Sequence, residues 1–273
     1  MPELPEVETV RQTLIPKLVG RKIKSVDVLY PNIIVYPVIS DFVKQLSDET
    51  INDIKRKGKW LIFELDNYYL LSHLRMEGKY HFKTKKDKIE KHEHVNFILD
   101  NDMCLRYNDT RKFGRMYLYK KEEAFKNKPL NELGLEPWDN NLTISYLKQK
   151  YTNKTIPIKT VLLDQSIITG IGNIYADEIL FLSSINPLKK AKDLNEKELE
   201  MIINKTRLIL EQAIKDGGTT IRSYESSEGV HGRFQQNLLV HNQVNKKCKN
   251  CGTNIIKIQV NGRGTYYCPK CQK

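Results

Sequence analysis

The sequence has no apolar run near the length needed to cross a bilayer, which is roughly 20 residues. It begins MPELPEVETV, without the basic segment and apolar stretch of an export signal. Cysteine is scarce, with five among 273 residues, and four of these form two close pairs near the C-terminus. We therefore expect a soluble, cytoplasmic protein with no membrane partner, whose paired cysteines bind metal instead of forming disulfides.

Positively charged residues outnumber negatively charged ones in the sequence. The formal net charge is +12 and the isoelectric point is about 9.3. This balance favours a polyanionic partner, with nucleic acid ahead of an anionic membrane surface. The alternative is that lysines simply cover solvated faces, and charge alone does not separate the two. A hydrophobic content of 40% supports packed cores and excludes a disordered chain.

The apolar pattern changes period along the chain. Val7, Val10 and Leu14 have helical spacing within residues 5–15, whereas short apolar runs between about residues 22 and 119 predict an all-β body. Turn-forming residues around 131–140 predict a linker, and helical patterns follow until Gly217 and Gly218. Residues from 217 to about 246 are rich in Gly, Ser, Gln and Asn, which suggests a long mobile loop.

The cysteine spacing is the most specific motif. Two CxxC pairs flank a segment with strand character on both sides of an Asn-Gly turn, as a hairpin that closes a four-thiolate zinc site requires. The ligands would be Cys248, Cys251, Cys268 and Cys271. Residues 246–273 hold seven basic and no acidic residues, so the metal would fold the hairpin and the hairpin would present cations. Arg263 at its tip is the candidate phosphate contact, whereas Cys104 in a strand-like run is expected to be buried.

A second anion-binding element is predicted at residues 168–178. Gly170 and Gly172 precede a helix, where backbone N–H groups and the helix dipole favour an anion. Asn173 either caps that helix or reaches a phosphate, and Lys159 supplies a cation that could meet the same phosphate. The two flanking helices resemble a helix–turn–helix DNA reader.

The amino terminus offers a nucleophile. Removal of Met1 would expose the secondary amine of Pro2, which can attack a sugar carbon and form an iminium ion. Glu3 lies beside it and could shuttle protons. The alternative is an ordinary helix start, and the local sequence fits both.

Several motifs together resemble the formamidopyrimidine-DNA glycosylase family over nearly all 273 residues. They are PELPEVE, KGK around Lys59, HLRMEGKY, KHEHV, NDTRKFG, LLDQSIITGIGNIYADEILF, GGTTIRSY and the four-cysteine finger. The resemblance implies an α+β multidomain protein. It has an N-terminal helix plus β-sandwich (1–133), a linker (134–140), a helix–two-turn–helix domain (141–245) with a lesion-recognition loop at about 217–240, and a zinc finger (246–273).

The resemblance also implies the activity. A member of this family excises oxidised purines such as 8-oxoguanine and formamidopyrimidines from double-stranded DNA, preferably opposite cytosine. It does so through a Schiff base on the N-terminal proline, then cuts the strand by β,δ-elimination. We further expect a monomer that binds one structural Zn²⁺ and associates with the bacterial nucleoid.

Site residues follow from the same resemblance. The catalytic set matches Pro2, Glu3, Lys59 and Arg263, and Glu6 matches an acid near the site that could mainly hold the helix start. Met76, Arg111 and Phe113 match the side chains inserted where the base is flipped out, and Lys112 lies between the last two. Further DNA-binding positions match His73, His92, Lys159, Asn173 and Arg263.

Five named positions depart from the family pattern. Thr110 and Lys112 stand where proline and arginine are usual, which removes stiffness and a bidentate guanidinium. Arg75 and Glu77 are added on either side of Met76, and His241 stands where a lesion-contacting tyrosine is expected. These departures bear on base recognition, which we expect the loop 222–235 to perform mainly through backbone groups.

Two alternatives remain at this point. An oxidised-pyrimidine enzyme resembling endonuclease VIII would share the Pro2–Glu3 chemistry and the finger. A zinc-finger DNA-binding protein without catalysis would use Pro2 and Glu3 only to start a helix.

Overall fold

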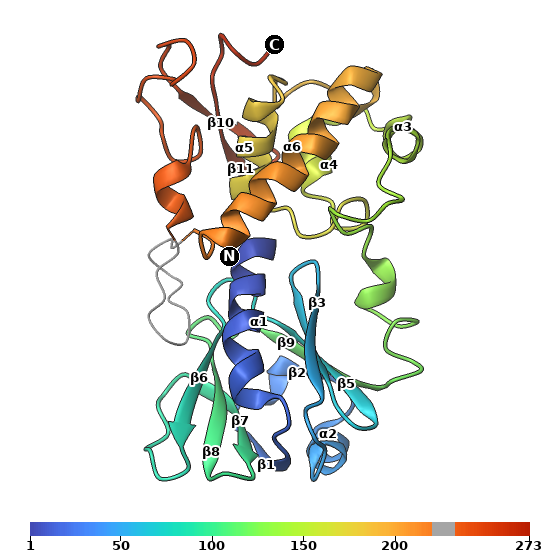
Figure 1. Cartoon of the computed structure of the whole chain (residues 1–273), viewed down its shortest axis with the longest axis vertical. Coiled ribbons are helices and arrows are strands. Elements are labelled where there is room, and N and C mark those ends of the chain that lie inside the picture. The colour runs from blue at the N-terminus through green and yellow to red at the C-terminus, as the bar shows by residue number, and fades with distance from the viewer. Residues whose placement is uncertain (220–232) are drawn as a thin grey trace. The chain divides into compact units, whose positions relative to one another are not determined.

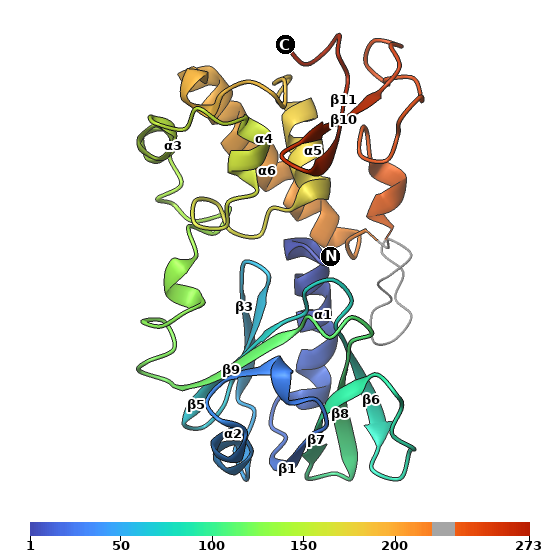
Figure 2. The same cartoon turned by 180° about the vertical axis from the view of Figure 1, so that it is seen from behind.

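The computed structural model describes residues 1–219 and 233–273, which form two compact units (Figures 1 and 2). The first unit holds residues 1–131 and Thr219, and the second holds residues 132–218 and 233–273. Within these described ranges, no helix is long and apolar enough to span a membrane.

The first unit is a β-sandwich with a helix at its start. Helix α1 (Leu4–Leu18) runs further than the predicted 5–15, because Leu18 also buries its side chain in the core. A four-stranded sheet has the order β1-β7-β8-β6 and a five-stranded sheet the order β2-β9-β5-β4-β3. The strands are β1 (Ile23–Val28), β2 (Ile34–Tyr36), β3 (Asp53–Lys57), β4 (Trp60–Glu64), β5 (Tyr68–His73), β6 (Lys79–Thr84), β7 (Glu93–Leu99), β8 (Met103–Asn108) and β9 (Arg115–Lys120).

The core of this unit lies between the two sheets and α1. Alternate residues such as Phe97 and Leu105 from one sheet, and Phe63 and Leu118 from the other, belong to one buried cluster. One expectation was wrong here: the body is not purely β, since α2 (Ile39–Leu46) lies between β2 and β3. Its Phe42 and Leu46 are buried in the same core.

The second unit is helical and ends in a β-hairpin. Its helices are α3 (Ile144–Tyr151), α4 (Ile158–Leu162), α5 (Asn173–Leu182) and α6 (Glu196–Lys215), followed by strands β10 (Ile256–Val260) and β11 (Arg263–Tyr267). The Asn261-Gly262 turn has positive φ at both positions, 46° and 72°, as a tight hairpin turn requires. Gly218 donates its N–H to the carbonyl of Ala213 and ends α6 as expected.

The segment before the finger differs from expectation. Residues 233–246 were predicted to be part of a mobile loop, but the 3₁₀ helix at Phe234–Asn237 and the residues after it are packed. Phe234, Leu238, Val240 and His241 are all buried. The prediction failed because the segment is rich in polar residues, and its few apolar residues gave no periodic pattern. Residues 220–232, which include most of the predicted lesion-recognition loop 222–235, lie outside the described part of the chain.

Candidate active site and nucleic-acid interface

The N-terminal amine lies in a partly buried, charged environment in the first unit, although the Met1 side chain is exposed. Burial is the main cause that lowers the pKa of the Met1 amine, while the carboxylates of Glu3 and Glu6 act to raise it and the Lys59 ammonium acts to lower it. Pro2 is buried, and Glu3 and Lys59 are only 2% and 5% exposed. The three catalytic candidates of this unit are therefore gathered around one amine.

Glu6 holds the start of α1. One carboxylate oxygen accepts the backbone N–H of Glu3 at 2.9 Å, half of a reciprocal capping box. The other oxygen accepts the N–H and hydroxyl of Thr219 at 2.7 and 3.0 Å. Glu6 thus joins the amino terminus to the residue that precedes the segment 220–232, a role its sequence position did not reveal.

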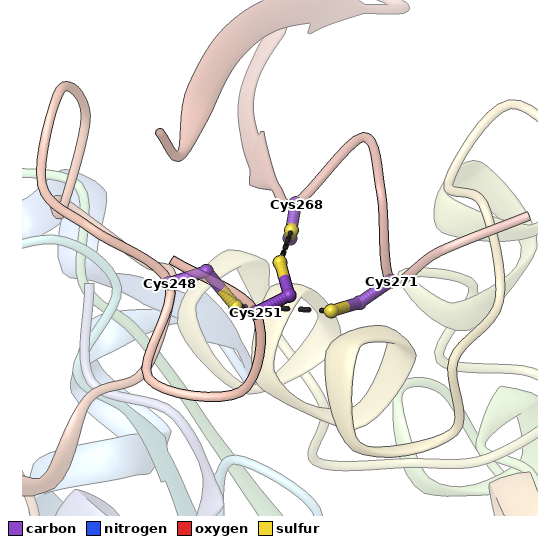
Figure 3. Close-up of side chains that lie close together, drawn as sticks. All are labelled: Cys248, Cys251, Cys268 and Cys271. Atoms are coloured by element: carbon purple, nitrogen blue, oxygen red, sulfur yellow. Dashed lines mark hydrogen bonds between the residues drawn. The ribbon is translucent and has the colours of Figure 1, made fainter. Parts of the chain in front are cut away.

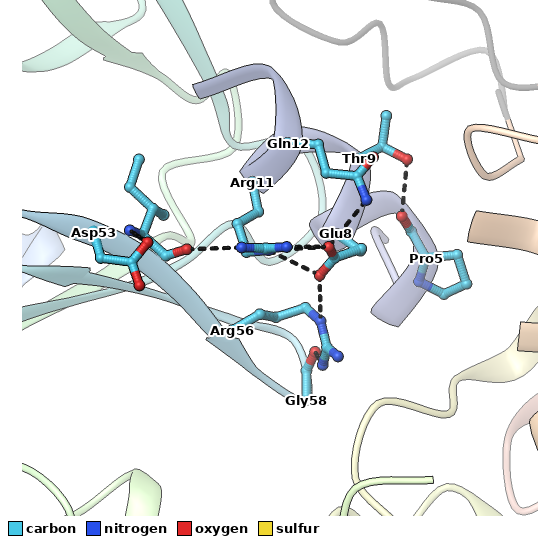
Figure 4. Close-up of polar contacts among 9 residues, drawn as sticks. Pro5, Glu8, Thr9, Arg11, Gln12, Asp53, Arg56 and Gly58 are labelled. Atoms are coloured by element: carbon cyan, nitrogen blue, oxygen red, sulfur yellow. Dashed lines mark hydrogen bonds and ion pairs between the residues drawn. The ribbon is translucent and has the colours of Figure 1, made fainter. Parts of the chain in front are cut away.

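A buried ion network supports the turn that carries Lys59. Glu8 binds the guanidinium groups of Arg11 at 2.7 Å and Arg56 at 3.0 Å (Figure 4). Burial would raise the pKa of Glu8, but the hydrogen bonds and charges of the two arginines outweigh it and lower the pKa. Arg56 also donates to the carbonyl of Gly58, which has a φ of 56° and directly precedes Lys59. Sequence reasoning missed this network, because Arg56 lies 48 residues from Glu8 in the chain.

Arg111 and Phe113 lie in a short loop, residues 109–114, which we call the wedge loop. The carboxylate of Asp109 accepts the backbone N–H groups of Arg111, Phe113 and Gly114 at 3.0, 2.9 and 2.8 Å. Asp109 is fully buried, whereas the Phe113 ring is 46% exposed and stacks under the Arg111 guanidinium at 4.8 Å. A large apolar ring is thereby held outward on a rigid turn, as insertion into a base stack needs.

Met76 lies in a second turn that is bonded to the wedge loop. The hydroxyl of Thr110 donates to the carboxylate of Glu77, so two residues that depart from the family pattern contact each other. This bond ties the turn carrying Met76 to the wedge loop. Lys112 has a φ of 58° and places its ammonium 4.6 Å from the centre of the Tyr30 ring.

His73 and His92 lie beside these turns. The Nδ1 atom of His73 accepts the N–H of Arg75 at 2.9 Å, so its ring proton is on Nε2. Burial is the main cause that lowers the pKa of His73 to about 3. The carbonyl of His92 accepts the N–H of Asp109 at 2.9 Å, which joins the start of β7 to the wedge loop.

The four finger cysteines converge as predicted (Figure 3). Their sulfur atoms all lie within 4.8 Å of one another, with Cys251–Cys268 at 3.5 Å and Cys248–Cys271 at 3.8 Å. Four zinc–sulfur bonds of about 2.3 Å in a tetrahedron place sulfurs about 3.8 Å apart, so the cluster fits one Zn²⁺. Cys104 is buried in β8, as expected, and lies outside this cluster.

Asn173 and Arg263 are brought together within the second unit. The side-chain amide of Asn173 donates to the carbonyl of Gly264 at 2.9 Å, next to the exposed Arg263. Asn261, in the hairpin turn, donates to the hydroxyl of Thr160 at 3.0 Å. The finger tip is therefore fastened to both helices of the predicted helix–turn–helix. The N-cap of α5 is Gly172, not Asn173, because the side chain of Asn173 bonds to the finger instead.

Lys159 has a different position from the one predicted. Its side chain has no exposed surface, and its ammonium binds the carboxylate of Asp177 and the carbonyl of Asn173. The second carboxylate oxygen of Asp177 binds Nδ1 of His241 at 2.7 Å. We therefore correct the direct phosphate contact of Lys159: it joins α4 to α5. His241, which stands where the family has a tyrosine, is also buried, with its ring against Tyr266.

Known proteins resemble the chain along its whole length. Residues 1–116 match the formamidopyrimidine-DNA glycosylase N-terminal domain, residues 133–225 the H2TH domain of that family, and residues 245–273 a zinc finger found in FPG and IleRS. The formamidopyrimidine-DNA glycosylase of Oceanobacillus iheyensis is 48% identical, over 100% of this chain and 98% of that protein.

Solved structures agree with the sequence matches. A Lactococcus lactis variant of the enzyme, bound to DNA containing Fapy-dG, superposes with a TM-score of 0.94 at 40% identity, covering 100% of both chains. The wild-type Lactococcus lactis protein with DNA containing an oxidised pyrimidine gives a TM-score of 0.92, also at 40% identity and with 100% of both chains covered.

Proposed function

The chain belongs to the formamidopyrimidine-DNA glycosylase family, and from this we propose that it attacks damaged DNA with the amine of Pro2 after Met1 is removed. The protein is a DNA glycosylase and abasic-site lyase of base-excision repair that acts on oxidised purines. Its finger holds one structural zinc ion.

The burial of Pro2 beside Glu3 and Lys59 carries the proposal for Pro2. An amine is nucleophilic only when it is neutral, and burial favours the neutral form, as it does for the Met1 amine while Met1 is still present. The nitrogen lone pair forms a bond to C1′ as the bond to the damaged base breaks. Loss of a proton from nitrogen and opening of the sugar ring then give the Schiff base. Glu3, beside this amine, is the proposed proton carrier, and Lys59 the cation beside the reacting sugar.

The wedge loop supports duplex recognition. We assign Phe113 to the opened base stack, Met76 to the space left by the flipped base, and Arg111 to the orphaned partner. A guanidinium suits the acceptor groups of cytosine, so we propose cytosine as the preferred opposite base. His73, His92, Lys112, Asn173 and Arg263 are the proposed backbone contacts, and Arg263 is also assigned to the final elimination.

The proposed reaction also indicates the location and the oligomeric state of the protein. Its substrate is chromosomal DNA, so we propose that it works as a monomer at the bacterial nucleoid in the cytoplasm. One chain supplies the amine, the wedge loop and the finger, so no second copy is needed to complete the set.

Borohydride trapping tests the nucleophile. Protein lacking Met1 is mixed with an 8-oxoguanine:cytosine duplex, an oxidised-pyrimidine duplex or undamaged DNA, and the adduct is located by peptide mass spectrometry. We expect an adduct on Pro2 with the oxidised purine. A matched protein that keeps an N-terminal extension should form no adduct, because the nitrogen of Pro2 is then part of a peptide bond and is not nucleophilic.

Each other outcome has a definite meaning. An adduct on Lys59 would refute Pro2 as the nucleophile while leaving the enzyme class intact. Trapping only with the oxidised pyrimidine would change the substrate class. No adduct with any damaged duplex would refute Schiff-base catalysis.

A further inference from the structure

The connection between β6 and β7 is strongly basic. Residues 83–91 hold five lysines and two acids, a formal charge of +3 over nine residues. We call these lysines the lysine strip: Lys83, Lys85, Lys86, Lys88 and Lys91. None of the proposed catalytic or DNA-binding residues belongs to it.

The acids of this segment are occupied by local contacts. The Asp87 carboxylate accepts the N–H of Thr84 at 2.6 Å, and Glu90 pairs with Lys83 at 3.1 Å. The other lysines of the strip are exposed and form no ion pair with any described residue. Four cations are therefore available to an external anion.

A buried arginine gives the strip a fixed backbone. The side chain of Arg106, on β8, is 2% exposed and its guanidinium donates to three carbonyls of the strip segment and to the carboxylate of Glu93. The carbonyls are those of Thr84, Asp87 and Lys88, at 3.2, 2.7 and 3.0 Å. A backbone that is ordered before binding loses little entropy when a ligand binds. The backbone of the lysine strip is therefore ordered in advance, as a binding surface requires, whereas a loop of solvated lysines needs no such support.

The strip is continuous with the wedge loop. It ends next to His92, whose carbonyl accepts the N–H of Asp109. At its other end, Thr84 pairs with Met103 on β8, five residues before Asn108, which adjoins Asp109. Five strand residues span about 17 Å. Successive phosphates of one DNA strand are about 3.4 Å apart along the axis, so this length corresponds to about five base pairs.

We propose that the lysine strip is a second DNA contact, which binds backbone phosphates of the duplex on one side of the lesion, about five base pairs from the wedge loop. This inference rests on the proposed function, since the wedge loop fixes where the duplex lies. The ligand is duplex DNA because the cations are spaced along a strip whose last residue, Lys91, adjoins His92, one of the residues assigned to DNA. Figures 1 and 2 show this connection along the β6 edge of its sheet.

Two mirrored duplexes test the strip. Each carries a stable abasic-site analogue with about four base pairs on one side and about twenty on the other, with the sides exchanged between the two. The variant is Lys85→Gln/Lys86→Gln/Lys88→Gln. Losing three phosphate contacts lowers the slope of log affinity against log salt by about 2.7. We expect affinity to fall at least tenfold for one duplex and to stay within about twofold for its mirror image.

A matched control separates local contact from net charge. The variant Lys44→Gln/Lys120→Gln/Lys126→Gln removes the same charge from exposed positions outside the strip. It should bind both duplexes like the parent protein. Replacing the three strip lysines by arginine should restore binding, and melting temperatures would identify a folding defect.

Three outcomes would overturn the strip as a DNA contact. They are unchanged affinity for both duplexes, an equal loss on both, and an equal loss in the control variant. Borohydride trapping of the strip variant on the unaffected duplex keeps the two proposals apart. Trapping that succeeds there while binding is unchanged on both duplexes refutes the strip alone. Trapping that fails in the parent protein refutes the nucleophile alone.

Discussion

His73 illustrates how burial sets the chemistry of a single residue. It is 8% exposed, its ring meets Trp60 edge-on at 4.7 Å, and burial with the nearby charges of Arg75 and Lys59 lowers its pKa to about 3. At neutral pH the ring is uncharged. His73 can therefore offer DNA a neutral N–H from Nε2, and it stays uncharged at mildly acidic pH, where an ordinary histidine becomes an imidazolium.

This lowered pKa has a consequence for stability. Because the folded pKa lies below the unfolded value of 6.5, the unfolded chain takes up a proton that the folded protein does not as pH falls from about 6.5 to about 3. The free energy of unfolding should thus decrease by about 2 kcal/mol between about pH 7.5 and about pH 5 from this residue alone.

The variant His73→Asn isolates that contribution. Asparagine keeps an acceptor for the N–H of Arg75 but does not titrate. Its free energy of unfolding, measured by urea denaturation, should depend less on pH than that of the parent, by about 2 kcal/mol over the same range. Parallel pH curves for the two proteins would contradict a buried neutral His73.

At the scale of elements, the wedge loop depends on one carboxylate. In the parent protein, one carboxylate oxygen of Asp109 accepts the N–H groups of Phe113 and Gly114. The variant Asp109→Asn replaces that oxygen by an amide NH₂ group, which cannot accept them. A lost acceptor at a buried site costs about 2 to 3 kcal/mol. We expect this loss in urea denaturation, together with at least tenfold slower excision from duplex DNA in single-turnover assays.

Phe113→Ala is the matched variant for this loop. Its ring is 46% exposed, so its removal should leave the free energy of unfolding within about 0.5 kcal/mol while excision slows by a similar factor. If Asp109→Asn lost stability but kept full excision, the ordered wedge loop would not be needed for catalysis.

The contact between Lys159, Asp177 and His241 operates at the same scale. These residues join α4 and α5 to the segment before the finger, while Glu178 accepts the backbone N–H groups of Leu239, Val240 and His241 at 2.8 to 2.9 Å. Burial raises the pKa of Glu178, although these three hydrogen bonds oppose it. Two adjacent acids of one helix thus fix the chain that leads to the zinc ligands.

At the scale of the whole molecule, zinc is expected to affect DNA affinity but not the chemistry of the N-terminal amine. The metal orders the finger, whose tip is bonded to Thr160 and Asn173 and carries Arg263. The amine and its neighbours belong to the first unit, and none of the four zinc ligands is among the residues described for that unit.

Removing zinc with a chelator should therefore weaken duplex binding at least tenfold and reduce its salt dependence. The thermal transition of the first unit should persist in calorimetry. Adding one equivalent of Zn²⁺ should restore binding, with metal content checked by mass spectrometry. Full affinity in zinc-free protein would contradict the role of the finger.

Sequence motifs determined much of this protein because they encode local geometry. The CxxC spacing fixes a metal site, the Asn-Gly pair fixes a hairpin turn, and apolar periodicity fixed most helices and strands. The family and its activity followed from motifs spread over the whole chain. Helix α2 was missed because its short apolar pattern falls among strand-like runs.

The tertiary structure alone decided which charges are exposed. A lysine is a residue type that often binds phosphate, but Lys159 is buried and forms an ion pair with Asp177, which is 18 residues away in the chain. Arg106 is likewise used inside the protein, where it orders the lysine strip. Whether a charge is available to DNA depends on partners that folding brings together from distant positions, and no local pattern specifies those partners.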